Sequence, residues 1–185
     1  MNIYKPNCDT MEDFLSGRPA ATEECGAKQT CNACRKEEIR CDHAALKCGT
    51  PQTTTIPDTA AAGDAFYAAS LNLDTAKYHA PCIRFEFAGN IVTAPGAVAL
   101  NFQLTKQCKY QGAAVPVGPV WSFSRTGLTA AESDMFAFSV CDCGLCDDEC
   151  CSYSVVVTVE SLGVEGNVVI NNASLTALVV EQHHC

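Results

Sequence analysis

The chain has 185 residues, of which 48% are hydrophobic, so it is long enough for one domain with a real core but too short for two full domains. Its 21 acidic residues outnumber its 12 basic ones, and the formal net charge of −9 argues against a nucleic-acid partner. No stretch approaches the roughly 20 apolar residues of a membrane-spanning helix, so we expect no membrane insertion.

The cysteine content indicates the redox environment of the protein. Fourteen cysteines in one chain of this length are unusual for a reduced cytosolic enzyme and indicate an oxidising destination. The first residues, MNIYKPNCDTMEDF, show neither a basic n-region nor the apolar run of a signal peptide. Three explanations stay open at this point: the protein meets oxidant without Sec-type export, a leader has been removed from the chain, or the cysteines bind metal in a reducing cell.

Residues 1–55 are predicted to form a Cys-rich N-terminal arm and linker. The first fifty residues contain six cysteines and few large apolar side chains, so they cannot build a core alone. Helix formers from Arg35 to Lys47 predict a short cross-linked helix. The Pro, Gly and Thr content of residues 49–64 predicts a linker or an extended lead-in.

Residues 56–185 alternate between apolar and polar with a period of two, which is typical of strands with one buried face. In CIRFEFAGNIV, for example, Ile83, Phe85 and Phe87 point one way while the residues between them point the other. Similar runs are FYAASLNLD, AVALNFQLTKQC, VWSFSR, MFAFSVC, YSVVVTVESL, GNVVI and SLTALVVE, and the turn signals AGN, APG, QGAAVPVGP, SRTG and NNA separate most of them.

About eight short strands without intervening helices predict an all-β fold, an antiparallel β-sandwich of jelly-roll or immunoglobulin-like type. The strand topology cannot be inferred from the sequence. We expect the space between the two sheets to contain Phe85, Phe87, Leu100, Phe102, Phe138, Val155, Val157 and Val159.

The chain shows no signature of an enzyme. Its histidines, His43, His79, His183 and His184, lie in no recognisable motif, and there is no GxSxG, Gly-rich phosphate loop or HExxH. The CxxC of Cys31 and Cys34 lacks the βαβ context of a redox motif. We expect no catalytic residues and no cofactor.

Metal binding is the main chemical alternative, because CxxC pairs at residues 31–34 and 143–146 could share one zinc ion. Their separation is far longer than in a zinc ribbon, and most other cysteines would remain unexplained. The CxCxxCxxxCC spacing of residues 141–151 fits neither ferredoxin pattern. We therefore expect disulfides and no bound metal.

Adjacent cysteines constrain the disulfide pattern. Cys150 and Cys151 point to opposite faces of the strand that they begin. Cys151 shares the apolar face with Tyr153 and Val155, so it is expected to face inward and Cys150 outward. An outward cysteine is either a free thiol or half of a bond to another chain. Cysteines near the two termini, Cys8 and Cys185, can also reach another chain. This placement favours polymerisation.

The cysteines therefore fall into two groups. Four are candidates for bonds between chains, with donors on the arm and acceptors on the domain: Cys8, Cys25, Cys150 and Cys185. Ten are candidates for bonds within the chain: Cys31, Cys34, Cys41, Cys48, Cys82, Cys108, Cys141, Cys143, Cys146 and Cys151. The alternative is that the arm folds back on its own sandwich and every bond is internal.

The chain resembles a family of clostridial Cys-rich proteins that carry a domain of unknown function. The resemblance rests on the segments APCIRFEFAGNIV and CDCGLCDDECCSYSVVVTV, together with the Cys-rich arm and the β-rich C-terminal part. This resemblance covers most of residues 48–180 and implies no activity. In architecture the chain is also similar to bacterial endospore appendage subunits, in which a jelly-roll domain bears a cysteine-containing N-terminal connector that bonds to neighbouring subunits.

These observations predict a structural, self-assembling subunit of a disulfide-cross-linked filament or layer, which is extracellular or on a spore surface. We expect the subunits to polymerise head-to-tail through the arm, so that the homo-oligomer is a helical filament. The likeness to spore-surface proteins fits a missing signal peptide, since those proteins are made in the mother cell. Two alternatives stay open: a metal-binding intracellular protein, with zinc or an iron–sulfur cluster, and a secreted β-sandwich binding module.

Overall fold

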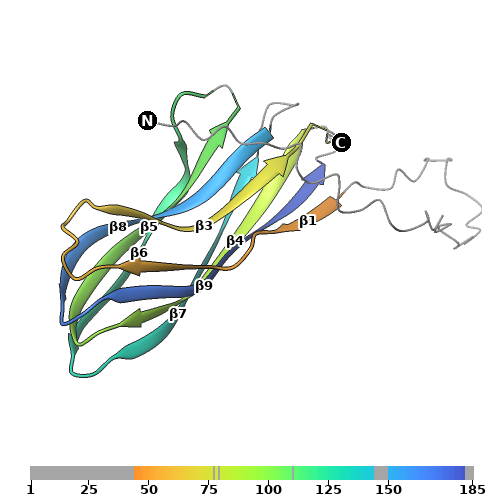
Figure 1. Cartoon of the computed structure of the whole chain (residues 1–185). Coiled ribbons are helices and arrows are strands. Elements are labelled where there is room, and N and C mark those ends of the chain that lie inside the picture. The colour runs from red at the N-terminus through yellow and green to blue at the C-terminus, as the bar shows by residue number, and fades with distance from the viewer. Residues whose placement is uncertain (1–43, 77, 79, 110, 144–149, 182–185) are drawn as a thin grey trace, which may run out of the picture.

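A computed structural model describes residues 44–76, 78, 80–109, 111–143 and 150–181, and within these ranges the chain forms strands joined by turns. The strands are β1 (Ala44–Cys48), β2 (Gln52–Ile56), β3 (Ala65–Asp74), β4 (Pro81–Thr93), β5 (Gly96–Cys108), β6 (Val115–Leu128), β7 (Glu132–Cys143), β8 (Cys150–Val164) and β9 (Val168–Glu181). They form the elongated two-layered body seen in Figure 1.

The strands pair into two sheets. Sheet A has the order β1-β9-β4-β7, with β2 also paired to β9, and sheet B has the order β3-β8-β5-β6. Every pairing is antiparallel. Because β1 and β2 pair with successive parts of β9, they act as one interrupted strand. The resulting order is that of a jelly roll, so the predicted all-β sandwich is confirmed and its topology is now known.

The core lies between the two sheets. Phe85 of sheet A packs against Tyr153 of sheet B with ring centroids 4.3 Å apart, and Phe87 packs against Phe102 at 5.8 Å. The residues expected in the core are all buried: Phe85, Phe87, Leu100, Phe102, Phe138, Val155, Val157 and Val159. The period-two pattern thus identified the inward faces of β4, β5, β7 and β8 correctly.

Three of the expected turn signals are wrong, because they lie wholly inside strands. SRTG, residues 124–127, lies inside β6. AGN lies inside β4 and NNA lies inside β9, where Ala88 pairs with Ser174 and Asn90 pairs with Asn171 across a register shift. Asn172 takes the extra position of this bulge with φ of 52°, a left-handed conformation that Asn tolerates. The segments GNVVI and SLTALVVE are therefore parts of one strand, β9.

The beginning of the sandwich also differs from the expectation. The predicted helix from Arg35 to Lys47 is wrong for its last residues, since Ala44–Cys48 is strand β1, and its earlier part lies outside the described residues. The expected domain start is residue 56. Strand β1 lies before this residue and β2 ends at it, and both strands belong to sheet A. Pairing with the long edge of β9 overrides the helix propensity of AALK.

Candidate functional site

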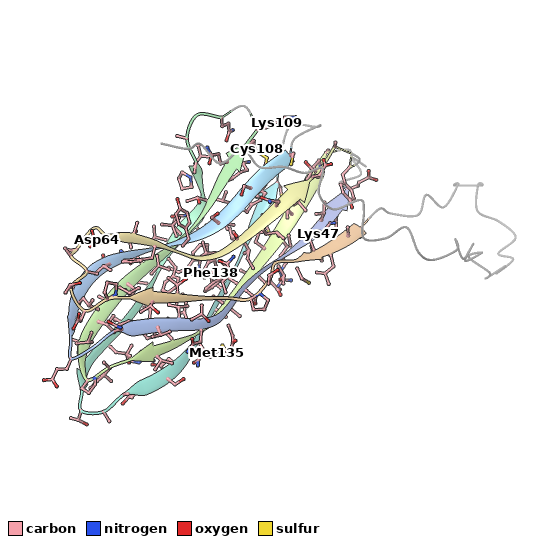
Figure 2. The ribbon with its side chains drawn as sticks, viewed as in Figure 1. Lys47, Asp64, Cys108, Lys109, Met135 and Phe138 are labelled. Carbon is pink, nitrogen blue, oxygen red and sulfur yellow. A yellow bond between two sulfur atoms is a disulfide. The ribbon has the colours of Figure 1, made fainter. Side chains whose placement is uncertain are left out.

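The features that carry chemistry gather at one end of the sandwich, which we call the cysteine end. Two disulfides lie wholly within the described residues: Cys82–Cys143 and Cys108–Cys151. Each joins residues that are direct partners in neighbouring strands, β4 with β7 in sheet A and β5 with β8 in sheet B. Each sheet therefore carries one of these two disulfides at this end, where Cys108 is labelled in Figure 2.

The two disulfides differ in exposure. Cys108 and Cys151 are only 4% and 3% exposed, because they continue the inward-facing rows of β5 and β8. Cys82 and Cys143 lie between inward residues of their strands and face away from the core, Cys82 half-buried and Cys143 exposed. The sheet B disulfide is thus shielded from solvent, whereas the sheet A disulfide lies on the outer face.

A polar network joins the two sheets beneath the cysteines. Lys106 of β5 donates from Nζ to Oδ2 of Asp142 on β7 at 3.0 Å, and the Tyr153 hydroxyl of β8 donates to the same oxygen at 3.2 Å. The Lys106 and Asp142 side chains are each 16% exposed. This network couples the ends of three strands from both sheets, so the cysteine end is held as one unit.

Two cysteines of the described part are free thiols, Cys48 and Cys141, and both are exposed. Residues directly opposite one another in an antiparallel ladder share a face. Cys48 pairs with Thr176 of β9, and Cys141 pairs with Arg84 of β4. Because both pairs point away from the core, the two thiols lie on the same outer face of sheet A.

Exposed apolar side chains lie between these thiols. Leu46 of β1 is 67% exposed and pairs with Leu178 of β9, which is also exposed, and Val180 follows on the same face. We call Leu46, Leu178 and Val180 the sheet A patch. Arg84 continues the row from Leu178 toward Cys141, and its charge is balanced by Glu86 at 2.8 Å. Exposed apolar side chains and one ion pair therefore connect the two thiols across this face.

Seven of the fourteen cysteines lie in the described residues, and five of these seven are in disulfides. Cys82, Cys108, Cys143 and Cys151 form the two disulfides above. Cys150, expected as an outward acceptor for another chain, takes part in a disulfide, so its sulfur is already bonded. Outside the described residues lie the remaining candidates: Cys8, Cys25, Cys31, Cys34, Cys41, Cys146 and Cys185.

Cys48 and Cys141 were assigned to bonds within the chain from the sequence, and the structure shows them as free thiols. The signal for Cys141 was present in MFAFSVC: Phe136, Phe138 and Val140 alternate inward, so the next residue must point outward. Cys48 gave no such signal, because the residues directly before it, up to Lys47, were expected to form a helix.

No group of three or more His, Cys, Asp or Glu side chains able to hold a metal ion occurs among the described residues. All four histidines lie outside them. The described part of the chain also has no helix long and apolar enough to cross a membrane.

Fold and site together define a cysteine-rich jelly-roll domain with disulfides at one end and free thiols on one outer face. The family model "Domain of unknown function (DUF4489)" matches residues 42–180, so the chain belongs to this family. The resemblance to a family with a domain of unknown function is thereby confirmed. No curated protein matches the chain.

Some solved structures are similar to this chain at low identity and with TM-scores below 0.5. A structure of infectious bursal disease virus, Gx strain, is similar over 90% of this chain and 37% of the viral chain, with 16% identity and a TM-score of 0.44. A carbohydrate-binding module specific for non-crystalline cellulose is similar over 66% of this chain and 73% of its own, with 15% identity and a TM-score of 0.38. The chain thus spans well under half of the viral chain that it matches.

Proposed function

We propose that this protein is a structural, self-assembling subunit of a disulfide-cross-linked filament or layer on an extracellular or spore surface. The observation that carries the proposal is the pair of exposed thiols on the outer face of sheet A, Cys48 and Cys141, in a domain whose other described cysteines are all in disulfides. A domain whose other described cysteines are oxidised, and which leaves two thiols on one surface, is equipped to bond to another chain.

These two thiols cannot bond to each other. Cys48 lies on β1 and Cys141 on β7, at opposite ends of the order β1-β9-β4-β7, so three strand spacings separate them. At about 4.8 Å per spacing this is roughly 14 Å, whereas disulfide-bonded residues have Cα atoms within about 7 Å. Each thiol therefore needs its own partner sulfur from a segment that crosses this face.

The N-terminal arm is the partner that we propose. Residues 1–43 contain five cysteines and continue directly into Ala44 at the start of β1, so the arm leaves the domain beside the sheet A patch. An arm without a core of its own gains order by burying apolar side chains on such a patch and by cross-linking. Docking on Leu46, Leu178 and Val180 would cover side chains that are now exposed to water.

We assign the arm to a neighbouring subunit rather than to the same chain. If each subunit donates an arm and receives one, the contact is head-to-tail and propagates as a filament unless it closes into a ring. The donors remain Cys8 and Cys25 on the distal arm, and Cys185 remains a second terminal candidate. Because Cys150 is already bonded, the acceptor role on the domain moves to Cys48 and Cys141. No enzymatic activity, metal or cofactor is part of this proposal.

Non-reducing electrophoresis of the oxidised full chain tests the function. We expect a ladder of reduction-sensitive multimers that is lost in the Cys48→Ser/Cys141→Ser double variant and after deletion of residues 1–25. Met135→Ala is the matched control, since Met135 is exposed on the same outer face but away from the thiols. An undiminished ladder in the double variant would show that these thiols are not the acceptors. A full-length chain that stays monomeric would contradict self-assembly.

A further inference from the structure

The exposed disulfide of sheet A has a free thiol beside it. Cys141 and Cys143 are two positions apart on β7, so both point to the outer face, and Cys143 is bonded to Cys82 on β4. The third sulfur, Cys141, is free and exposed. Three cysteines on one solvent-facing surface thus hold one disulfide and one thiol.

Their spacing allows more than one pairing. Cys82 and Cys143 have Cα atoms 4.2 Å apart. Residues two apart on a strand are separated by about 6.6 Å, within the upper limit of about 6.8 Å for a disulfide. Cys82 is the diagonal neighbour of Cys141, at roughly 7 to 8 Å. A Cys141–Cys143 bond therefore fits the strand, and a Cys82–Cys141 bond requires only a small adjustment.

We infer that Cys82, Cys141 and Cys143 form a thiol–disulfide exchange site. The Cys141 thiolate attacks Sγ of Cys143, the Cys141–Cys143 bond forms, the Cys82–Cys143 bond breaks, and Cys82 leaves as the thiolate. One disulfide and one thiol are present before and after, so the step needs no oxidant or reductant. The free sulfur moves from β7 to β4 on the same face.

The class of ligand that this site takes is the thiol of a cysteine-containing peptide segment. An incoming thiolate that attacks the Cys82–Cys143 bond forms a mixed disulfide and releases one of the two cysteines. Cys141, or the released cysteine, can then expel the incoming sulfur again. Bonds formed at this face are in this way reversible, while the exchange within one chain requires no second subunit and stands independently of the proposed assembly.

The second disulfide serves as an internal reference. Cys108 and Cys151 are buried between the sheets, and the two free thiols of the described part lie on the opposite side of sheet A, facing solvent. A thiolate in solution or on that outer face cannot reach the buried bond without opening the sandwich. Of these two bonds, exchange should therefore occur only at Cys82–Cys143.

Differential alkylation of the full-length protein tests the site. The protein is held at mildly alkaline pH without reductant, quenched by acidification, alkylated with N-ethylmaleimide at mildly acidic pH, and mapped by peptide mass spectrometry. Because exchange proceeds through the thiolate, acid preserves the distribution. In the monomer fraction, separated by size-exclusion chromatography after the quench, we expect the label to be shared between Cys141 and Cys82 at every protein concentration, with none at Cys108 or Cys151.

Two variants make the result decisive. Cys141→Ser should lower the label at Cys82 by roughly tenfold or more, since the attacking thiol is gone. Cys48→Ser is the matched control, because it removes the other free thiol of the same face and should leave the Cys82 label unchanged. Label found at Cys141 alone in the wild-type protein, or Cys82 label that persists in Cys141→Ser, would overturn the inference.

A trapping experiment provides an independent check. In Cys82→Ser, oxidised with glutathione disulfide, we expect a Cys141–Cys143 bond in place of the native one. Retention of the Cys108–Cys151 bond and a β-rich circular dichroism spectrum show that the variant has folded. Two alkylatable thiols at Cys141 and Cys143 in that folded variant would contradict the proposed geometry, and if the variant does not fold, the wild-type labelling still decides.

Discussion

Strand β4 has two faces of opposite character. On its inner face Ile83, Phe85 and Phe87 are buried against sheet B, while on its outer face Cys82, Arg84 and Glu86 border a surface that carries free thiols and exposed leucines. Both faces belong to the same thirteen residues, and only the alternation of the strand separates them. Stability and reactivity can therefore be changed independently in this protein, one on each side of sheet A.

The largest expected effect lies on the inner side. Phe102 is fully buried, and its ring packs against Phe87 and Phe136 at 5.8 and 4.5 Å between centroids. Phe102→Ala should lower the free energy of unfolding by about 3 to 5 kcal/mol, because it leaves a cavity between the sheets. Urea unfolding followed by circular dichroism measures this. A loss as small as that of Met135→Ala, an exposed side chain, would show that the two faces do not differ as described.

The two disulfides give the next contrast. Removal of the buried bond by Cys108→Ala/Cys151→Ala should lower the free energy of unfolding by about 2 to 4 kcal/mol. The bond links residues 43 positions apart, and without it the unfolded chain gains conformational entropy. In the native protein a dilute reductant should open Cys82–Cys143 before Cys108–Cys151, since of these two bonds only Cys82–Cys143 lies on an outer face. Timed reduction with peptide mapping tests the order. Faster loss of Cys108–Cys151 would refute the assignment of buried and exposed bonds.

A smaller effect on stability is expected in the polar network between the sheets, which consists of Lys106, Asp142 and Tyr153. Asp142→Asn keeps the shape of the side chain but removes the charge that Lys106 and Tyr153 both contact. We expect a loss of about 1 to 3 kcal/mol, because the Lys106 ammonium remains partly buried without its counter-ion. Thermal unfolding measures it. Glu86→Gln is the control, since its ion pair with Arg84 is exposed and should contribute little.

The smallest effect on stability is expected at the sheet A patch. Leu46→Ser and Leu178→Ser should change the free energy of unfolding by no more than about 0.5 kcal/mol, because both side chains are exposed. They should nevertheless raise the protein concentration at which multimers form, because arm docking would lose apolar contacts. Light scattering against concentration reports this. Unchanged assembly in both variants would remove the patch from the proposed docking surface.

The alternation of residue types was sufficient to predict the sandwich and most of its core, because burial between two sheets selects every second residue. Cys151 was placed inward by the same argument, and it is buried in the structure. The bulge formed by Gly89 and Asn172 could not be predicted, since Gly and Asn also mark turns, and only pairing between distant strands distinguishes the two cases. Jelly-roll topology depends on the same long-range pairing.

The sequence predicted the chemistry of the candidate site, which is cross-linking by cysteines, but not which cysteines are bonded and which are free. Cysteine density indicated cross-linking, yet which sulfurs bond depends on strand register: Cys82 meets Cys143 and Cys108 meets Cys151 only because β4–β7 and β5–β8 align those positions. Cys141 falls opposite Arg84 in the same ladder and so remains without a sulfur across from it. Cys48 was obscured by the helix propensity of its segment, which pairing with β9 overrides.

The most direct test of the central claim is disulfide mapping of assemblies made from a mixture of two isotopic forms of the full-length protein, one with light and one with heavy nitrogen. Multimers formed after mixing the reduced forms and reoxidising them would be digested without reduction and analysed by mass spectrometry. The account predicts peptides in which Cys48 or Cys141 of one isotopic form is bonded to an arm cysteine of the other. If every bond at Cys48 and Cys141 joins peptides of the same isotope, the arm folds back on its own sandwich and arm exchange between subunits is wrong.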